Sequence, residues 1–389
     1  MKKKNLHAWI TTGLFCSFLG CGALLSILLP KRSFSETENR YLAQKPAFTW
    51  ESLKTGEFGK QYEDYLSDQF PFRDGWISLK TAAELAQGKR EINGVWTGND
   101  GWLMETWYRE SFDHNLAEKN LEKLAQFASS QAELLGENRI RIMLVPSSPE
   151  ILPQHLPDFA SPFSQEIIPD TLKEKGLSSM LIPVGDALYK AAENAGPTAD
   201  NLYYRTDHHW TSHGAFLAYQ AWADSLEIKP YEKNDFTIET VTEQFSGTIQ
   251  SKINLPVRPD QIDLYRPVQE PSWSVFYDGN PEPSLSLYSM EALHTRDKYR
   301  VFLDGNHGWT KIKNQESASN RRLLILKDSY AHTFAPFAAL HFDETHMLDL
   351  RYFNGKVSQF CEKQQITDIL VLYQIPGFLK DRNVSKLTW

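Results

Sequence analysis

Four short strand-like segments recur along this sequence, with helical stretches between several of them. They span residues 140–145, 323–326, 347–352 and 369–373; the second and fourth are apolar throughout, whereas the first includes Arg141 and the third includes Asp349 and Arg351. Short continuous apolar runs are typical of strands that are buried on both faces of a sheet. Residues 116–135 and 331–340 instead carry apolar side chains at helical spacing. This alternation predicts an α/β fold with a mostly parallel sheet flanked by helices.

The pattern changes between about residues 236 and 315. Prolines, glycines and short β-like runs dominate there, for example in residues 245–249 and 299–303. We interpret this segment as an irregular β-rich insertion that lies over the site. Residues 31–49 are mostly polar, with Pro30 just before them and Pro46 near their end, which predicts a linker, and the folded domain is expected to span residues 50–389.

Residues 1–30 predict a membrane segment. Lysines at positions 2–4 precede an uncharged stretch from residue 8 to residue 29. A stretch of this length spans a bilayer as a helix, and the lysines place the N-terminus in the cytoplasm. A cleaved signal peptide has a similar charged start and apolar core. We expect an uncleaved signal anchor in the cell membrane, a single pass, with the folded domain on the extracytoplasmic side.

Composition narrows the choice of partners. With 41% hydrophobic residues, the chain of 389 residues has enough apolar side chains for a sizeable core. The net charge of −8 and the lack of a Lys/Arg-rich block beyond the N-terminus argue against a nucleic-acid partner. A neutral polysaccharide or a small ester is compatible with this charge.

One short segment is unusually rich in titratable groups. Asp207, His208, His209 and His213 place one carboxylate and three imidazoles within seven positions. If residues 207–209 are extended, Asp207 and His209 lie on one face of the chain and His208 on the other. A carboxylate beside an imidazole is the pair that activates a nucleophile. The segment therefore predicts an Asp207–His209 dyad.

The best candidate nucleophile is Ser329, which lies between the predicted strand 323–326 and the predicted helix 331–340. A serine at the C-terminal end of a buried strand is presented as in a nucleophile turn. An N-cap for the following helix is the alternative interpretation. Because the dyad is present elsewhere in the chain, we predict a triad of Asp207, His209 and Ser329.

Four further residues are candidates for contacts with a substrate or an oxyanion: Asn306, Tyr330, Arg351 and Tyr352. Asn306 could donate to a developing oxyanion, although its Asp-Gly-Asn-His context also fits an ordinary turn. Tyr330 adjoins the candidate nucleophile. Arg351 and Tyr352 end the predicted strand 347–352, and a structural Arg–Asp pair is the alternative for Arg351.

A metal site is the main chemical alternative. His209 and His213 are four residues apart and, with Asp207 or His208, form a ligand set for zinc or iron. The segment lacks the glutamate of an H-E-x-x-H helix, and His209 precedes the predicted helix instead of lying on it. A structural histidine cluster fits the same residues. We expect neither a metal nor another cofactor.

Several motifs in a fixed order resemble the bacterial DHHW family, which is related to the SGNH-hydrolase-like alginate O-acetyltransferases. They run from about residue 62 to residue 373 and include Phe70-Pro71-Phe72-Arg73, Gly101-Trp102-Leu103, Asp207-His208-His209-Trp210 and Lys327-Asp328-Ser329-Tyr330. The resemblance implies an SGNH-hydrolase-like fold and the triad roles for Asp207, His209 and Ser329. Lys327-Asp328 stand where the alginate enzymes have a small Gly-Thr turn.

The same resemblance implies an activity. Relatives act outside the cytoplasmic membrane and move acetyl groups onto polysaccharide hydroxyls, often beside a membrane-bound O-acyltransferase that supplies the acyl group. The resulting hypothesis is a membrane-anchored O-acetyltransferase, or an acetyl esterase, that acts on cell-surface or exported polysaccharide through an acyl-serine intermediate. A non-catalytic binding or scaffold protein of an envelope-polymer complex, and a His/Asp metal-dependent hydrolase, are the alternatives.

Overall fold

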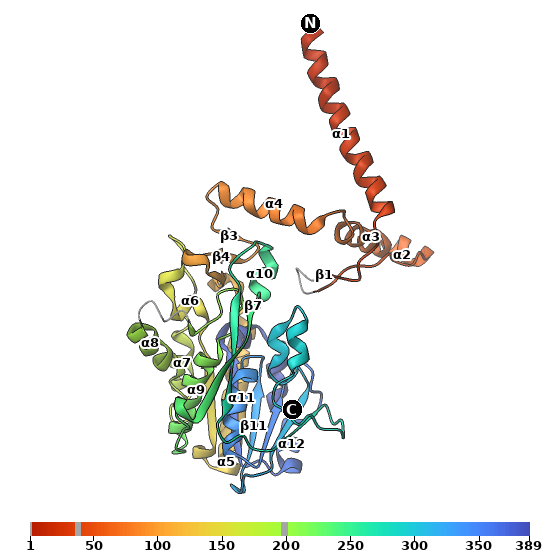
Figure 1. Cartoon of the computed structure of the whole chain (residues 1–389). Helices are drawn as coiled ribbons and strands as arrows, with labels where there is room; N and C mark the ends of the chain where they lie inside the picture. Colours follow the sequence, from red (N-terminus) through yellow and green to blue (C-terminus); the bar gives the residue numbers. More distant parts are fainter. Residues whose placement is uncertain (1, 36–39, 196–200) are drawn as a thin grey trace. The chain divides into compact units, whose positions relative to one another are not determined.

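The computed structural model of this chain describes residues 2–35, 40–195 and 201–389, which form two compact units (Figure 1). The smaller unit comprises Met1–Lys89 and Ser251–Pro256, and the larger comprises Arg90–Gln250 and Val257–Trp389. The sequence suggested a folded domain from residue 50, whereas residues 50–89 belong to the smaller unit. The division into anchor, linker and folded domain stays a prediction.

Helices dominate the smaller unit. Within α1 (Lys2–Leu28), the segment His7–Leu28 is, by length and composition, the one helix among the described residues that could span a membrane. The other elements are β1 (Phe34–Ser35), β2 (Arg40–Tyr41), α2 (Trp50–Lys54), α3 (Glu57–Asp68) and α4 (Arg73–Ala86). The segment expected as a linker makes defined contacts, because Arg40 forms a bidentate ion pair with Asp68 of α3 at 2.5 and 2.8 Å.

The larger unit is built on a six-stranded sheet with the strand order β6-β13-β11-β12-β10-β9. Its strands are β6 (Ile140–Val145), β9 (Trp273–Tyr277), β10 (Trp309–Asn314), β11 (Arg322–Lys327), β12 (Glu344–Leu348) and β13 (Asp368–Gln374). The first four strands in this order are parallel, and β10 pairs antiparallel with both β12 and β9. The expected α/β fold with a mostly parallel sheet is confirmed.

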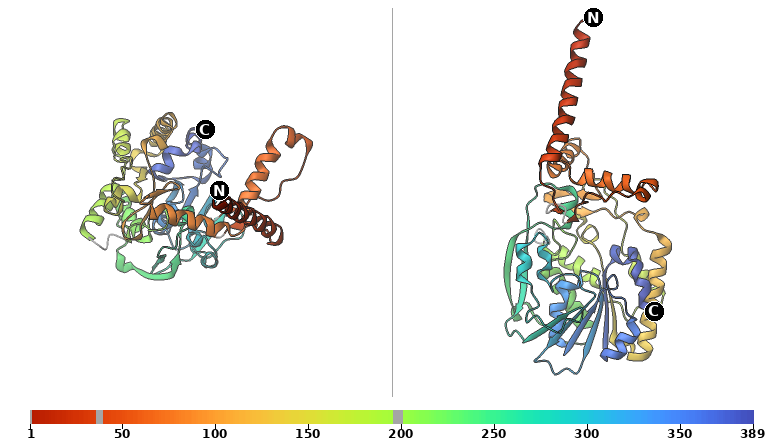
Figure 2. Two further views of the ribbon diagram at one scale, coloured as in Figure 1. Left: turned by 90° about the horizontal axis from the view of Figure 1, so that it is seen from above. Right: turned by 90° about the vertical axis from the view of Figure 1, so that its right-hand side faces the viewer.

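Helices cover both faces of this sheet (Figure 2). One face packs against α8 (Val184–Ala195), α9 (Ser212–Ser225) and α11 (Ala331–Ala338), and the other against α5 (His114–Leu135), α7 (Ile167–Glu174), α12 (Val357–Gln364) and α13 (Ile375–Lys380). Along β11, Leu323 and Ile325 point into the first core, whereas Leu324 and Leu326 point into the second. This burial on both faces explains why the strands appear in the sequence as continuous apolar runs.

The segment interpreted as a β-rich insertion divides between two structures. β7 (Phe236–Phe245) and β8 (Asp260–Pro267) pair antiparallel in a separate sheet, and α10 (Thr248–Ile253) lies between them in the chain. β9 and β10 instead extend the central sheet. The larger unit also contains a small antiparallel sheet and a short helix: β3 (Glu91–Ile92), β4 (Val95–Thr97), β5 (Leu103–Glu105) and α6 (Ser148–Ile151).

The C-terminal ends of β11 and β12 position the candidate site. The two strands are parallel neighbours, with Leu326 opposite Leu348. The residues that follow them, Ser329 and Asp349, therefore leave the sheet at the same edge, where open α/β sheets bind ligands. The predicted strand 347–352 continues four residues too far, because Asp349 Oδ1 accepts the backbone N–H of Arg351 at 3.1 Å and turns the chain.

The indole of Trp210 ties the segment before α9 to α11. Trp210 is fully buried, and its Nε1–H donates to the Tyr330 carbonyl oxygen at 3.0 Å and to Thr333 Oγ1 at 2.7 Å. Trp222 is equally buried, but its Nε1 has no partner among the described residues. Both side chains fill the core that contains α9 and α11.

We expect Trp210→Phe to lower the free energy of unfolding by about 1–3 kcal/mol more than Trp222→Phe, because only the first change removes hydrogen bonds. Denaturant titration of both full-length variants in detergent, followed by near-ultraviolet circular dichroism, measures the difference. Equal losses for the two variants would show that the Trp210 hydrogen bonds contribute no stability.

Candidate active site

The residues of the predicted dyad lie in a tight loop and not in an extended strand. Tyr203 and Trp210 pair across this loop, and the residues between them form bends. Asp207 Oδ1 accepts the backbone N–H of His209 at 3.1 Å, which is a local turn closed by an aspartate side chain. This turn, instead of a period of two, brings the carboxylate beside the imidazole. Thr211 then caps α9, as its residue type predicts.

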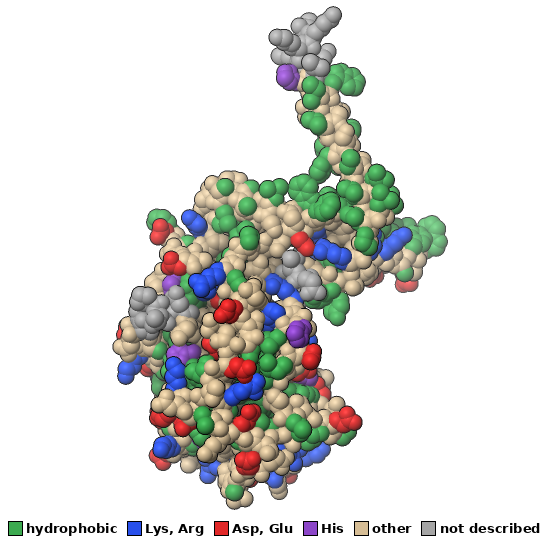
Figure 3. All heavy atoms as spheres, viewed as in Figure 1, with side chains coloured by type: hydrophobic (Ala, Val, Ile, Leu, Met, Phe, Trp, Pro, Cys, Tyr) green, Lys and Arg blue, Asp and Glu red, His purple; other side chains and the backbone are tan. Residues whose placement is uncertain are grey.

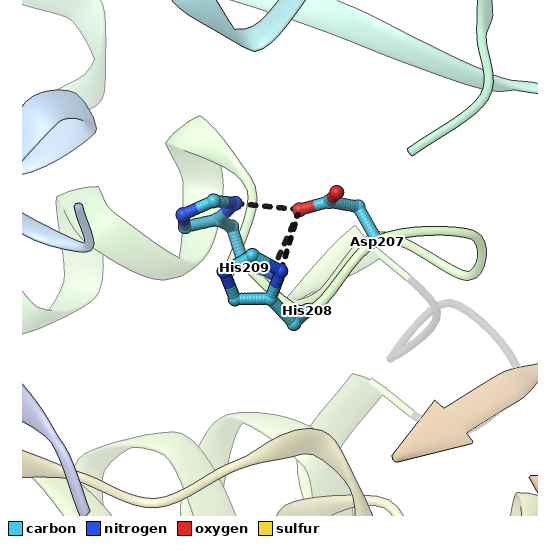
Figure 4. Close-up of side chains that lie close together, drawn as sticks. All are labelled: Asp207, His208 and His209. Carbon is cyan, nitrogen blue, oxygen red and sulfur yellow. Dashed lines mark hydrogen bonds and ion pairs between the residues drawn. The ribbon is translucent and has the colours of Figure 1, made fainter. Parts of the chain in front are cut away.

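The structure brings the three residues of the predicted triad together. His209 Nδ1 lies 2.5 Å from Asp207 Oδ1 (Figure 4), and His209 Nε2 lies 2.7 Å from Ser329 Oγ. Asp207 and His209 are buried, whereas Ser329 is half-buried. Because an ionised carboxylate only accepts hydrogen bonds, His209 carries its proton on Nδ1 and presents the Nε2 lone pair to the serine hydroxyl. An imidazole held in this way can take the hydroxyl proton.

Hydrogen bonds from two segments satisfy the Asp207 carboxylate. His209 donates to Oδ1, while the backbone N–H and hydroxyl of Thr248 donate to Oδ2 at 2.7 and 3.0 Å. Because that hydroxyl gives its proton to Asp207, it accepts from His208 Nδ1, which lies 2.7 Å away. Burial raises the pKa of Asp207, but the adjacent imidazoles and the hydrogen bonds outweigh burial and hold the pKa well below its usual range.

The electrostatic setting of His209 favours a neutral ring. Its pKa is lowered to about 4, chiefly because burial disfavours the imidazolium and also because His208 is adjacent, while Asp207 acts in the opposite direction. The ring stacks on Tyr299, with centroids 3.8 Å apart and an interplanar angle of 10°. At neutral pH, His209 is therefore uncharged and able to act as a base.

Asp328 holds the turn that presents Ser329. Its Oδ1 accepts the backbone N–H of Tyr330 at 2.9 Å, and its Oδ2 accepts the backbone N–H of Gln374 at 2.8 Å. Burial raises the pKa of Asp328 to about 6. The carboxylate thus links the turn after β11 to the last residue of β13.

Lys327 begins a polar network beside this turn. The buried Nζ lies 2.7 Å from His332 Nε2 and 3.4 Å from Asp349 Oδ2, and burial lowers the pKa of Lys327 to about 8. Asp349 in turn forms a bidentate pair with Arg351, at 2.6 and 2.8 Å. Arg351 Nη2 reaches Asn306 Oδ1 at 3.4 Å. This is the Arg–Asp pair that the sequence left as the alternative for Arg351.

The four candidates for substrate contact occupy two environments. Asn306, Arg351 and Tyr352 are exposed and lie together, with the Arg351 guanidinium 5.5 Å from the Tyr352 ring centroid. Tyr330 is fully buried, and its hydroxyl donates to the His208 carbonyl oxygen and accepts from Gln374 Nε2. This burial leaves the Tyr330 side chain no access to a substrate, so it positions the loop of the dyad instead.

Sequence reasoning did not identify Thr248 or Tyr299 as part of the site. Both come from the segment interpreted as an insertion, and neither lies at a spacing that relates it to residues 207–209. Only the tertiary fold brings Thr248 to Asp207 and Tyr299 to His209. Gly247, directly before Thr248, is the one local signal, because a glycine permits close approach of two chain segments.

The ligand set proposed for a metal is assembled only in part. Asp207, His208 and His209 offer atoms that lie within 4.8 Å of one another. However, both ring nitrogens of His209 are hydrogen-bonded, to Asp207 and to Ser329. His213 lies outside this cluster, with its Nδ1 3.4 Å from the Tyr265 hydroxyl. A metal held by these residues would have to replace the hydrogen bonds of the triad.

Gly247 leaves room for the Asp207 side chain, because a Cβ at position 247 would overlap Asp207 Cβ and Oδ2. We expect Gly247→Ala to lower the free energy of unfolding by about 1–3 kcal/mol, as overpacking of a close contact does. Gly185→Ala is the matched control, since the added Cβ meets only Pro146, at 3.5 Å. Chemical denaturation of both variants measures the effect, and an unchanged Gly247→Ala variant would contradict the close approach.

Comparison with known proteins agrees with this architecture. A sequence model of the DHHW protein family matches residues 184–348, a range that contains Asp207, His209 and Ser329. A DHHW family protein from Eubacterium siraeum is 21% identical in sequence, with a TM-score of 0.60 over 76% of this chain and 95% of the other. Bacillus cereus PatB1, solved with a sulfonyl adduct, is 23% identical, with a TM-score of 0.60 over 76% of this chain and 98% of the other.

These similarities confirm the resemblance to the DHHW family and the expected fold. No curated protein matches the sequence. The roles of individual residues therefore rest on the geometry of this chain.

Proposed function

We propose that this chain is a membrane-anchored, extracytoplasmic enzyme that transfers acetyl groups to polysaccharide hydroxyls through an acetyl-Ser329 intermediate. The observation that carries the proposal is the hydrogen-bonded series of Asp207, His209 and Ser329, with separations of 2.5 and 2.7 Å. The resemblance to the DHHW family, through its relation to the alginate O-acetyltransferases, supports the choice of acetyl transfer. The span His7–Leu28 in α1 supports the anchor.

The first half-reaction acetylates Ser329. His209 Nε2 takes the proton of Ser329 while Oγ attacks the carbonyl carbon of the acetyl donor. The tetrahedral intermediate collapses, its bond to the leaving oxygen breaks, and that oxygen receives the proton from His209. Asp207 stabilises the transient imidazolium and keeps the ring oriented.

The second half-reaction transfers the acetyl group from Ser329 to the acceptor. A sugar hydroxyl gives its proton to His209 Nε2 and attacks the acetyl carbon, and Ser329 leaves with the proton restored to Oγ. If water takes the place of the sugar, the same residues form an acetyl esterase. A membrane-bound O-acyltransferase is the partner that we propose as the source of acetyl groups.

We expect Ser329→Ala to reduce hydrolysis of a chromogenic acetyl ester by at least about a thousandfold, because the nucleophile is lost. A sulfonyl fluoride should label Ser329, and peptide mapping identifies the labelled site. Ser358→Ala is the control, because Ser358 is exposed on α12 and should leave both readouts unchanged. Equal turnover by the Ser329→Ala variant and the parent chain would refute the serine mechanism.

The pH dependence of kcat/KM tests the lowered pKa of His209. The acid limb of kcat/KM should have an apparent pKa near 4, below the ordinary value of 6.5, because a protonated imidazole cannot act as the base. His208→Gln should move this limb to higher pH, since His208 lowers the pKa of His209. A limb that stays in place or moves to lower pH would contradict the assignment.

The lowered pKa of His209 also predicts how the stability of the folded chain changes with pH. An imidazole whose pKa is lower in the folded state binds its proton more readily when the chain is unfolded. His209 therefore contributes to a loss of stability as the pH falls from about 6.5 towards about 4. Because burial also lowers the pKa values of His213, His332, His341 and His346, the contribution of His209 is the difference between the parent chain and His209→Gln in denaturant titrations across this range.

Three outcomes separate the alternatives. Transfer of acetyl to an added oligosaccharide in competition with water distinguishes a transferase from an esterase. No turnover and no sulfonyl labelling would favour the scaffold protein. Stoichiometric zinc or iron that survives dialysis would favour the metal-dependent hydrolase, because Asp207, His208 and His209 offer the ligand atoms.

A further inference from the structure

The smaller unit exposes many large apolar side chains within a short stretch. Between residues 41 and 79, Trp50 is 71% exposed, Phe72 68% and Leu79 59%. The same stretch exposes Tyr41, Phe48, Leu53, Leu66, Phe70 and Trp76. The larger unit exposes comparable side chains singly over a much longer chain, as soluble surfaces do. A concentration of this kind marks an interaction surface, and we call this set of residues the apolar platform.

The outward face of α4 belongs to the apolar platform. Trp76 and Leu79 are three positions apart within α4, so they share one side of the helix, and the exposed Phe72 precedes them at its N-cap. The opposite side is held inside the unit, because Ser78 Oγ donates to the Asn254 carbonyl oxygen at 2.8 Å. The exposed apolar side chains of α4 therefore lie on a side of the helix that the Ser78–Asn254 contact does not cover.

Aromatic rings in mutual contact join α2 and α3. The Phe48 ring lies 5.4 Å, between centroids, from both Trp50 and Phe58, and Phe58 stacks on Tyr62 at 5.7 Å. Their edge-to-face and stacked arrangements are the ones that aromatic pairs prefer.

The apolar platform continues onto α1. The Trp76 ring lies 5.9 Å from the ring of Phe18, which is 52% exposed within the span His7–Leu28. Figure 3 shows hydrophobic side chains gathered along α1 and over the helices that follow it. The surface that we expect in lipid and the apolar platform are therefore in contact.

The residues near the end of α1 are of types that are common at a membrane–water interface. Lys31 Nζ lies 5.6 Å from the Tyr65 ring centroid. A cavity of about 470 Å³ opens at this junction, with Arg32, Phe70 and Phe72 among its lining residues. Aromatic rings beside basic side chains are enriched where headgroups meet acyl chains.

We propose that the apolar platform lies in the lipid interface of the membrane that α1 crosses, so that α2, α3 and α4 are monotopic helices beside a spanning one. This inference rests on the proposed anchoring by α1. Its ligand is a phospholipid surface, in which the rings and aliphatic side chains enter the acyl boundary while Lys31, beside Tyr65, faces phosphate groups.

The test uses the full chain in phospholipid nanodiscs, with Cys16, Cys21 and Cys361 replaced by alanine. Single cysteines at Phe72→Cys or Leu79→Cys carry an environment-sensitive fluorophore. Leu14→Cys in α1 is the reference, and Leu134→Cys on α5 is the matched control, because Leu134 is 76% exposed on a helix of the larger unit. Quenching by brominated lipids and by aqueous iodide is measured for each probe.

We expect brominated lipids to quench the probes at positions 14, 72 and 79 several-fold more than the probe at 134, and iodide to show the reverse. Lipid quenching at position 14 alone, with iodide quenching at 72 and 79, would overturn the platform and leave the anchor intact. No lipid quenching at any position would overturn both. Protection of 72 and 79 from both quenchers would show that protein, such as a second copy of the chain, covers the surface, and would also overturn the proposal. Ester hydrolysis by the same samples reports separately on the triad.

Discussion

A buried carboxylate is stable only if nearby groups donate to it, and Asp207 obtains its donors from two segments about forty residues apart. The loop that carries the dyad supplies the backbone and imidazole of His209. Thr248, at the start of α10, supplies its N–H and its hydroxyl. Without the second segment, a partly unpaired charge would remain in the core, at a cost of several kcal/mol. The orientation of His209 therefore depends on how closely the chain at Gly247 can approach the Asp207 side chain.

The base and the nucleophile are also held by hydrogen bonds that cross between their segments. The Trp210 indole donates to the carbonyl oxygen of Tyr330, and the Tyr330 hydroxyl donates to the carbonyl oxygen of His208. Ser329 lies between these contacts, in a turn that Asp328 fastens to β13. Each segment thus fixes the backbone of the other. The distance between His209 and Ser329 follows from packing and not from either loop alone.

The parts of the fold that could be predicted are those whose residues are buried on both faces. β6, β11 and β13 appear in the sequence as continuous apolar runs because helices cover both sides of them. β10 was not recognised as part of the sheet, because only alternate residues are buried and its polar positions resemble a loop. Tyr330 was expected near a substrate because it adjoins Ser329, but neighbouring residues on a turn point in different directions. Arg351 and Asp349 are two residues apart, so their pairing is local and was open to prediction.

By itself, the sequence determined the chemistry that is available: a carboxylate and an imidazole two residues apart, a serine after a buried strand, and an apolar N-terminal segment. These are properties of residue type and local spacing, which short stretches of chain encode. Only the tertiary structure decided that His209 meets Ser329, that Thr248 completes the Asp207 carboxylate, and that Tyr299 lies flat against the imidazole. Those contacts join residues 41 to 120 positions apart, and their geometry comes from the packing of a sheet and its helices, which no local pattern specifies.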